Sequence, residues 1–189
     1  MSDIRICGSM PTPGSQGPNH QALVQATRSC IVGAASDGYI RLIPTDLNWQ
    51  PASGPAEAAA AYGSQLFSGS DNADKRVDYE FYEQVNLIDA GENTTRIGCT
   101  LCDGDIDLEW FFGLIEEDSG SYESLGVTAP CCGAVVLLDA LRYDGPVGFA
   151  RFEVIAMNPA RGRYELDAQE LAEVGAILGH PVTQVLAHY

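Results

Sequence analysis

Two closely spaced pairs of cysteines in the middle of the chain constrain its fold more than any other feature. The chain has six cysteines, and four of them fall in the stretches CTLCDG (99–104) and APCCGA (129–134). Glycine comes shortly after each pair and proline precedes the second, which is typical of turns that hold a structural metal ion. The sequence therefore predicts a tetrahedral zinc site with four thiolate ligands: Cys99, Cys102, Cys131 and Cys132.

The two pairs differ in spacing, and this leaves other arrangements open. Two residues separate the first pair, which lets the backbone curl so that both sulfurs face one ion. Cys131 and Cys132 are adjacent, so both can bind one ion only if their turn is distorted. The fourth ligand would otherwise come from another side chain, such as Asp103, His180 or His188. A disulfide, plain buried thiols and a redox-active pair are the remaining alternatives.

The segment that carries both pairs, residues 90–146, resembles a zinc ribbon. It has a cysteine turn, a spacer of 28 residues, a second cysteine turn, and strand-prone sequence after each turn. It departs from the ribbon pattern at the adjacent cysteines. Together with the later segment YDGPVGFA, this build is also similar to bacterial proteins of no assigned activity, so the resemblance carries over no functional residues. A segment of this size with few large apolar groups needs a metal ion to supplement its core.

Hydrophobic patterns on both sides of this segment predict two similar halves. Strands are expected where apolar and polar residues alternate, and helices where apolar residues recur every three or four positions. The order is strand, helix, strand in each half, at 38–45, 55–69, 76–89, 148–159, 166–180 and 181–189. This order is typical of the ferredoxin-like (split βαβ) α+β fold, an antiparallel sheet with both helices on one face.

The chain is accordingly divided into three regions. Residues 37–89 and 147–189 are expected to form the ferredoxin-like α+β core, and residues 90–146 the inserted zinc-ribbon-like lobe. Residues 1–36 are rich in Gly, Pro and Ser and are expected to be a flexible leader with a short helix over 19–35.

Two local patterns make specific predictions for the core. Val77, Tyr79 and Phe81 alternate with polar residues, so their side chains should share one face of a strand. Asp167 should cap the start of the last helix and Gly179 should end it.

The charge of the chain limits its partners. It has 26 acidic and 10 basic residues, for a net charge of −16. Such a surface repels phosphate backbones and anionic lipids, so nucleic-acid and membrane binding are not expected. No secretory signal or apolar span is recognisable, which favours a cytoplasmic location where thiols stay reduced. Two explanations of the charge remain: it keeps the protein soluble, or it forms a docking face for a basic protein partner, as in an immunity protein or an inhibitor.

The acidic and aromatic stretch at 103–118 is the main candidate for a partner-binding surface. Its carboxylates do not have the spacing of an EF-hand, because Leu114 stands at position 12 of a loop that starts with Asp103 as position 1. Either its aromatic side chains pack against the ribbon, or they bind a partner if they are exposed. The weak candidates for partner binding are Asp105, Asp107, Glu109, Trp110 and Phe111.

The sequence favours a non-enzymatic, zinc-binding protein that acts by binding a macromolecule. It has no phosphate-binding loop, nucleophile elbow or HExxH motif, and no arrangement that singles out a catalytic triad. The alternative is a zinc-dependent hydrolase with three protein ligands and a water molecule, in which Asp103 or Glu109 acts as the base.

Overall fold

The computed structural model describes residues 37–67, 76–118, 120–145, 147–161 and 163–189. The expected leader and its short helix lie outside these ranges. Within them the chain is a mixed α+β protein with antiparallel sheets and three α-helices, which confirms the predicted class. None of the helices in these ranges is both long and apolar enough to cross a membrane.

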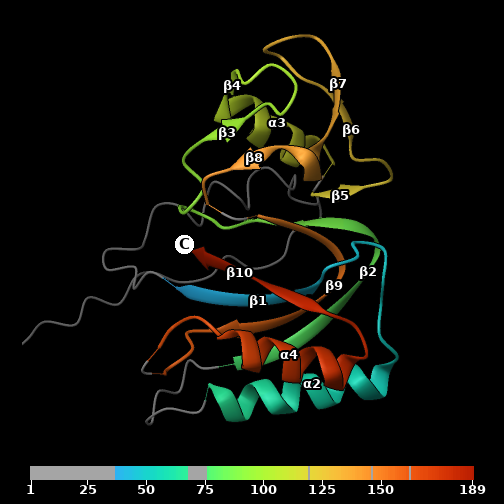
Figure 1. Ribbon diagram of the computed structural model, residues 1–189, viewed down its shortest axis with the longest axis vertical. Helices are drawn as coiled ribbons and strands as arrows, with labels where there is room; N and C mark the ends of the chain where they lie inside the picture. Colours follow the sequence, from blue (N-terminus) through green and yellow to red (C-terminus); the bar gives the residue numbers. More distant parts are fainter. Residues whose placement is uncertain (1–36, 68–75, 119, 146, 162) are drawn as a thin grey trace, which may run out of the picture. The chain divides into compact units, whose positions relative to one another are not determined.

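The main sheet has five strands in the order β10-β1-β9-β2-β5, and each neighbouring pair is antiparallel (Figure 1). The strands are β1 (Gly38–Pro44), β2 (Arg76–Ile88), β5 (Ser121–Tyr122), β9 (Gly148–Met157) and β10 (Val182–His188). Four of them begin and end within two residues of their predicted positions. The fifth, β5, comes from the inserted segment (residues 90–146) and extends the sheet beyond β2, which the sequence did not indicate.

Helices α2 (Ser53–Leu66) and α4 (Ala168–Leu178) lie together on one face of this sheet (Figure 1). The apolar layer between helices and sheet includes Ile40, Leu42, Phe152, Val154, Ala59 and Val174. Helix α2 approaches the sheet closely because its buried positions hold only alanine and glycine. At Gly63, for example, an added Cβ would lie 3.2 Å from Cγ1 of Val77.

The ends of α4 are fixed as its sequence predicts. The carboxylate of Asp167 accepts hydrogen bonds from the N–H groups of Gln169 (2.9 Å) and Glu170 (3.0 Å), and the Glu170 carboxylate accepts one from the N–H of Asp167 (2.9 Å). Gly179 ends the helix with a left-handed φ of 87°. A cap of this kind stabilises a helix by about 1 kcal/mol.

The predicted alternation along β2 holds only for the first half of the strand. Val77 and Tyr79 pack toward the helices, and Phe81 lies on the same face at its edge: its ring centroid is 5.0 Å from that of the buried Phe152, although Phe81 itself is 39% exposed. The pairing of β2 with β9 shifts register after Phe81 and resumes at Asn86, so β2 carries extra residues there. Such a bulge bends a strand and increases its twist. The predicted shared face is therefore confirmed as far as Phe81, and it ends at the bulge because a register shift cannot be read from alternation alone.

The inserted segment contains short strands and one helix. Its strands form a three-stranded sheet, β4-β3-β8, and a two-stranded sheet, β6-β7. Their bounds are β3 (Ile97–Gly98), β4 (Asp105–Ile106), β6 (Gly126–Thr128), β7 (Val135–Leu137) and β8 (Arg142–Tyr143). Helix α3 (Leu108–Asp118) lies between the two cysteine turns, where no helix is predicted from the sequence.

The inserted segment also has an apolar core, which corrects the expectation that a metal ion must replace one. Buried side chains of this segment pack with residues of β2 and β9 in one cluster, which includes Ile97, Ile106, Phe111, Leu138, Leu141, Val85, Leu87 and Phe149. The bulge in β2 is followed directly by the residues that join this cluster. The segment is therefore built onto the sheet through shared apolar contacts.

Candidate metal centre

The first pair of cysteines lies in a tight turn between β3 and β4. The N–H of Cys99 donates to the carbonyl of Gly104 (2.8 Å), and the N–H of Asp103 donates to the carbonyl of Cys99 (3.2 Å). Asp103 has a φ of 57°, in the left-handed region that residues other than glycine adopt infrequently. The turn reverses the chain, so Cys102 comes back beside Cys99.

The second pair lies in a turn with the same backbone pattern. The N–H of Ala129 donates to the carbonyl of Ala134, and the N–H of Gly133 donates to the carbonyl of Ala129, both at 2.8 Å. Gly133 has a left-handed φ of 71°. The two turns are therefore equivalent, position by position, over six residues each.

This equivalence shows how two adjacent cysteines reach one site. Cys132 takes the place of the second cysteine of the first turn, while the place of the first cysteine is taken by Ala129, which is fully buried. Cys131 takes the place of Leu101 and contributes its thiol from there. Gly104 leaves room for it, because an added Cβ would lie 3.2 Å from the Cβ of Cys131. The expectation that adjacent cysteines require a distorted turn was wrong.

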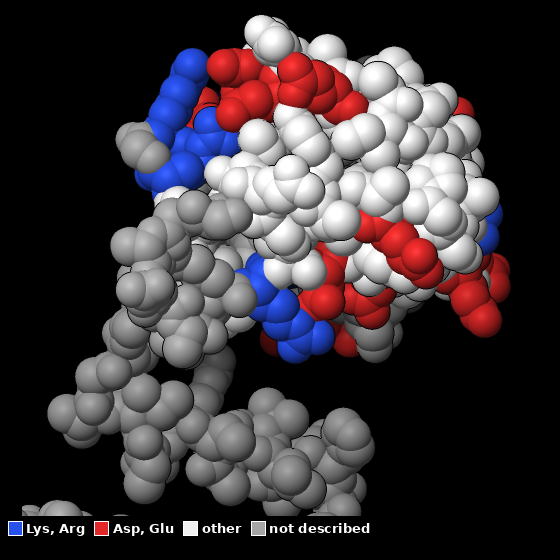
Figure 2. Space-filling view, turned by 90° about the horizontal axis from the view of Figure 1, so that it is seen from below, with Lys and Arg blue, Asp and Glu red and all other residues white. Residues whose placement is uncertain are grey.

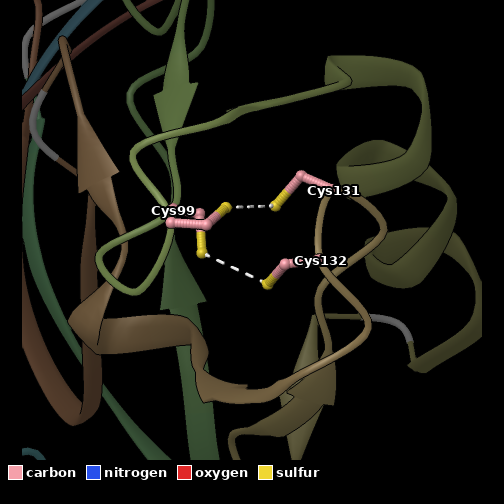
Figure 3. Close-up of side chains that lie close together, drawn as sticks. Cys99, Cys131 and Cys132 are labelled. Atoms are coloured by element: carbon pink, nitrogen blue, oxygen red, sulfur yellow. Dashed lines mark hydrogen bonds between the residues drawn. The ribbon is translucent and has the colours of Figure 1, made fainter.

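The four thiols converge on a single point. Their sulfur atoms all lie within 4.8 Å of one another. Sγ of Cys102 is 3.5 Å from Sγ of Cys131, and Sγ of Cys99 is 4.0 Å from Sγ of Cys132 (Figure 3). An ion bound by four thiolates at about 2.3 Å places its sulfurs about 3.8 Å apart. The observed separations bracket that value, and all four cysteines are free rather than joined in disulfides.

The thiols differ in their proton affinity. Hydrogen bonds from the backbone N–H groups of Leu101 and Cys102 lower the pKa of Cys99 to about 7. Desolvation, followed by the neighbouring thiols, raises the pKa of Cys131 to about 12. The pKa of Cys132 is also raised: a backbone N–H of its own turn lowers it, but desolvation and the other thiols outweigh that effect. Four thiols this close ionise together only when a cation lies among them.

An arginine on β8 holds the first turn in place. The Nη2 atom of Arg142 lies 3.2 Å from the carbonyl oxygen of Cys99 and 2.7 Å from Oδ1 of Asp103. Both ends of the ion pair are more than half exposed, so its contribution to stability is about 1 kcal/mol or less. Asp103 is thus engaged with Arg142 beside the cluster rather than being one of its members.

The five predicted partner-binding residues have different environments. Asp105 pairs with an exposed arginine, and Asp107 accepts a hydrogen bond from the N–H of Glu109 at the start of α3. Glu109 is exposed and Trp110 is half-buried. Phe111 is only 1% exposed and packs in the apolar cluster, so the exposure that partner binding would require is not met at this residue.

The two histidines considered as ligands lie elsewhere. The ring of His180 stacks on Trp49, with centroids 4.7 Å apart, and its Nδ1 lies 2.8 Å from the carbonyl of Pro181. His188 is exposed on β10. Among the described residues, the cysteines are the only group of three or more side chains that converge as metal ligands.

One buried ionisable group was not singled out from the sequence. Glu153 in β9 is 1% exposed, accepts a hydrogen bond from the hydroxyl of Tyr82, and lies 3.7 Å from Nε of Arg41. Burial raises the pKa of this carboxyl group. The sequence signal that could have identified Glu153 is its place as a single acid between Phe152 and Val154 within a predicted strand.

No protein family model matches the chain, and no match was found among curated proteins or among solved structures. The fold and the site together define an α+β protein with antiparallel sheets and a four-cysteine cluster that could hold a metal ion. Its function is therefore argued from the geometry of that cluster and from its surface.

Proposed function

We propose that the chain is a non-enzymatic zinc-binding protein whose closed four-thiolate site stabilises the inserted segment, and that it acts by binding a basic protein partner. The observation that carries the proposal is the convergence of four free sulfurs at separations suited to one tetrahedral ion. Soft thiolate ligands in this number select zinc or iron among the available metals. Zinc is proposed because tetrahedral four-cysteine sites are the usual form of structural zinc sites.

The role of the ion follows from the segments that it joins. Cys99 and Cys102 come from one turn, and Cys131 and Cys132 from another, with helix α3 and strand β6 between them. An ion at this point closes that loop and fixes both turns on the apolar cluster, which contains Cys99. Metal binding then contributes directly to the folding free energy of the inserted segment.

On this proposal the core is a ferredoxin-like sheet and the inserted segment is zinc-ribbon-like. The support for the core is the order of its elements, β1-α2-β2 and then β9-α4-β10, with the strands arranged β10-β1-β9-β2 and both helices on one face. The support for the ribbon is its two equivalent cysteine turns, each beside a small antiparallel sheet.

The partner is proposed to be a basic protein because of the charge of the chain. Its net charge is −16, and residues 97–145 alone carry ten acids and one base, a net of −9. The face that carries α2 and α4 is largely uncharged over its centre (Figure 2), so the helices are not the favoured docking face. Neutralisation of a basic protein in the cytoplasm, as by an immunity protein or inhibitor, is the corresponding biological role.

A hydrolytic zinc site is the less supported alternative. Such a site keeps one coordination position for water. Two observations support the closed site instead: four sulfurs lie within 4.8 Å of one another, and Asp103, one of the two candidate bases, pairs with Arg142.

The test is metal analysis of the reduced, purified full-length protein together with a thiol count. We expect one equivalent of zinc and two reactive thiols, because four of the six cysteines would be bound. All six should react after denaturation with a chelator. Cys30→Ser is the matched control: it should retain the zinc and lose one reactive thiol. A mapped disulfide within the cluster, or six reactive thiols in zinc-replete native protein, would contradict the proposal.

The partner proposal has its own test in salt. Binding of a defined basic probe such as oligolysine should weaken steeply as ionic strength rises from low to physiological values. Binding that does not respond to salt would remove the electrostatic reason for a basic partner.

A further inference from the structure

The two-stranded sheet of the inserted segment leaves one of its edges open. In the β6-β7 hairpin, the N–H of Ala129 bonds to the carbonyl of Ala134 (2.8 Å) and the N–H of Leu138 bonds to the carbonyl of Leu125 (2.9 Å). Hydrogen-bonded pairs alternate along an antiparallel ladder. The backbone N–H and C=O of Val135 therefore point away from β6, and so does the N–H of Leu137. Within the described residues, no strand pairs with β7 on that side.

The residues of this open edge also expose large apolar side chains. Val135 is 74% exposed and Leu137 is 51% exposed, while Val136 between them is 5% exposed and packs into the apolar cluster. Natural proteins protect exposed edges with charges, proline or bulges. The sequence of β7 and its flanks, AVVLL, has none of these. On β6, by contrast, the N–H of Gly126 is taken by the hydroxyl of Ser124.

The charge around the hairpin indicates what kind of chain would pair with it. Glu123 lies three residues before β6 and Asp139 two residues after β7, and both are exposed. Because the strands are antiparallel, these two carboxylates lie at the same end of the hairpin. A second copy of this chain would bring another net charge of −16 against them, which disfavours self-pairing.

We propose that the outer edge of β7 binds an extended segment of a basic partner protein, which adds a third strand to the β6-β7 sheet. Main-chain hydrogen bonds to Val135 and Leu137 would give affinity, apolar side chains of the segment would cover theirs, and lysine or arginine would approach Glu123 and Asp139. This inference rests on the proposed function for the sign of the partner's charge. It adds the surface and the mode of binding.

The probe for this test is a capped nonapeptide of alternating lysine and valine, added to the full-length protein as purified. Two control peptides accompany it: one with N-methylated valines, which lack backbone donors, and one with glutamate in place of lysine. Amide hydrogen exchange is measured by NMR, residue by residue. We expect at least tenfold slower exchange at Val135 and Leu137 with the lysine peptide, and no protection with either control.

Variants at Leu137 separate backbone pairing from apolar contact. Leu137 has a φ of −89°, close to the value that proline requires, and its N–H points outward, so Leu137→Pro removes the docking donor without removing a hairpin bond. Leu137→Thr keeps the donor and the strand propensity. We expect at least tenfold weaker peptide binding for Leu137→Pro, and a smaller loss for Leu137→Thr. Folding of both variants is checked by the exchange rates of α4.

Several results would overturn the inference. They are equal binding of the N-methylated peptide, binding without protection of Val135 and Leu137, no binding at all, or a dimer whose interface protects the same two amides. The zinc content of each sample is measured separately. A protein with one equivalent of zinc and no peptide binding refutes the edge proposal alone, whereas a protein without zinc refutes the proposed metal site whatever the peptide does.

Discussion

Removal of one exposed cysteine of the cluster tests how much the proposed zinc ion stabilises the protein. Cys102→Ser is the suitable change, because the side chain of Cys102 is exposed and its loss costs little packing, whereas Cys99 is fully buried in the apolar cluster. From Cys102 to Cys131 the chain spans 30 residues. An ion that joins these positions restricts the unfolded chain as a cross-link of the same span does, which corresponds to about 3 to 4 kcal/mol.

For a domain of this size, each kcal/mol shifts the unfolding midpoint by about 2–4 °C. We therefore expect Cys102→Ser to lower the midpoint by about 7–14 °C in thermal unfolding followed by circular dichroism. A strong zinc chelator should lower the wild-type midpoint by a similar amount and should leave the variant unchanged. Leu101→Ser, in the same turn and 62% exposed, is the matched control and should keep both the midpoint and the chelator response. A wild-type midpoint that ignores the chelator would refute the reasoning.

Three further changes test separate parts of the structure. Arg142→Ala should weaken zinc binding less than tenfold in competition with a chromophoric chelator, because it removes only exposed contacts to the first cysteine turn. Complete loss of the metal would contradict this and would show that Arg142 is essential to the site. Burial raises the pKa of Glu153, so the folded protein loses stability as pH rises from about 4.3 through that pKa. Glu153→Gln keeps an acceptor for the Tyr82 hydroxyl and should therefore gain stability relative to wild type over that range. A difference in stability that stays constant between pH 4 and 8 would contradict this. Asp167→Ala should cost about 1 kcal/mol in urea unfolding at pH 7. Hydrogen bonds from backbone N–H groups lower the pKa of Asp167, so the difference from wild type should shrink as pH falls through that lowered pKa.

The parts of the fold that local sequence controls were predictable. The strands of the main sheet follow alternation of apolar and polar residues, and α4 has a capping box at Asp167 and a glycine at its end. The convergence of the four cysteines was predictable because closely spaced cysteines flanked by glycine and proline are typical of turns that gather thiols at one point.

The parts that depend on tertiary contacts were not predictable. The bulge in β2 has no sequence signal of its own, and it coincides with the point where the strand begins to pack on the inserted segment. Helix α3 was hidden by the alternating acids that precede it, although Asp107 is a good residue for a helix start and Leu108, Phe111 and Ile115 follow at helical spacing. The packing of Phe111 in the apolar cluster is one of the two alternatives that the sequence offered for its aromatic group.

The second cysteine turn shows why spacing alone gives an incomplete prediction of a metal site. The usual spacing of two residues follows from a turn in which the first and fourth positions aim their side chains at one point. At 129–134 the turn is intact, but its first position is alanine and the third position supplies the thiol instead. Gly104 in the facing turn favours that exchange, because a Cβ there would lie 3.2 Å from the Cβ of Cys131, a tight contact. The ligand pattern of one turn is therefore set partly by the residue opposite it in the other, and a search for paired cysteines within a single turn omits this contribution.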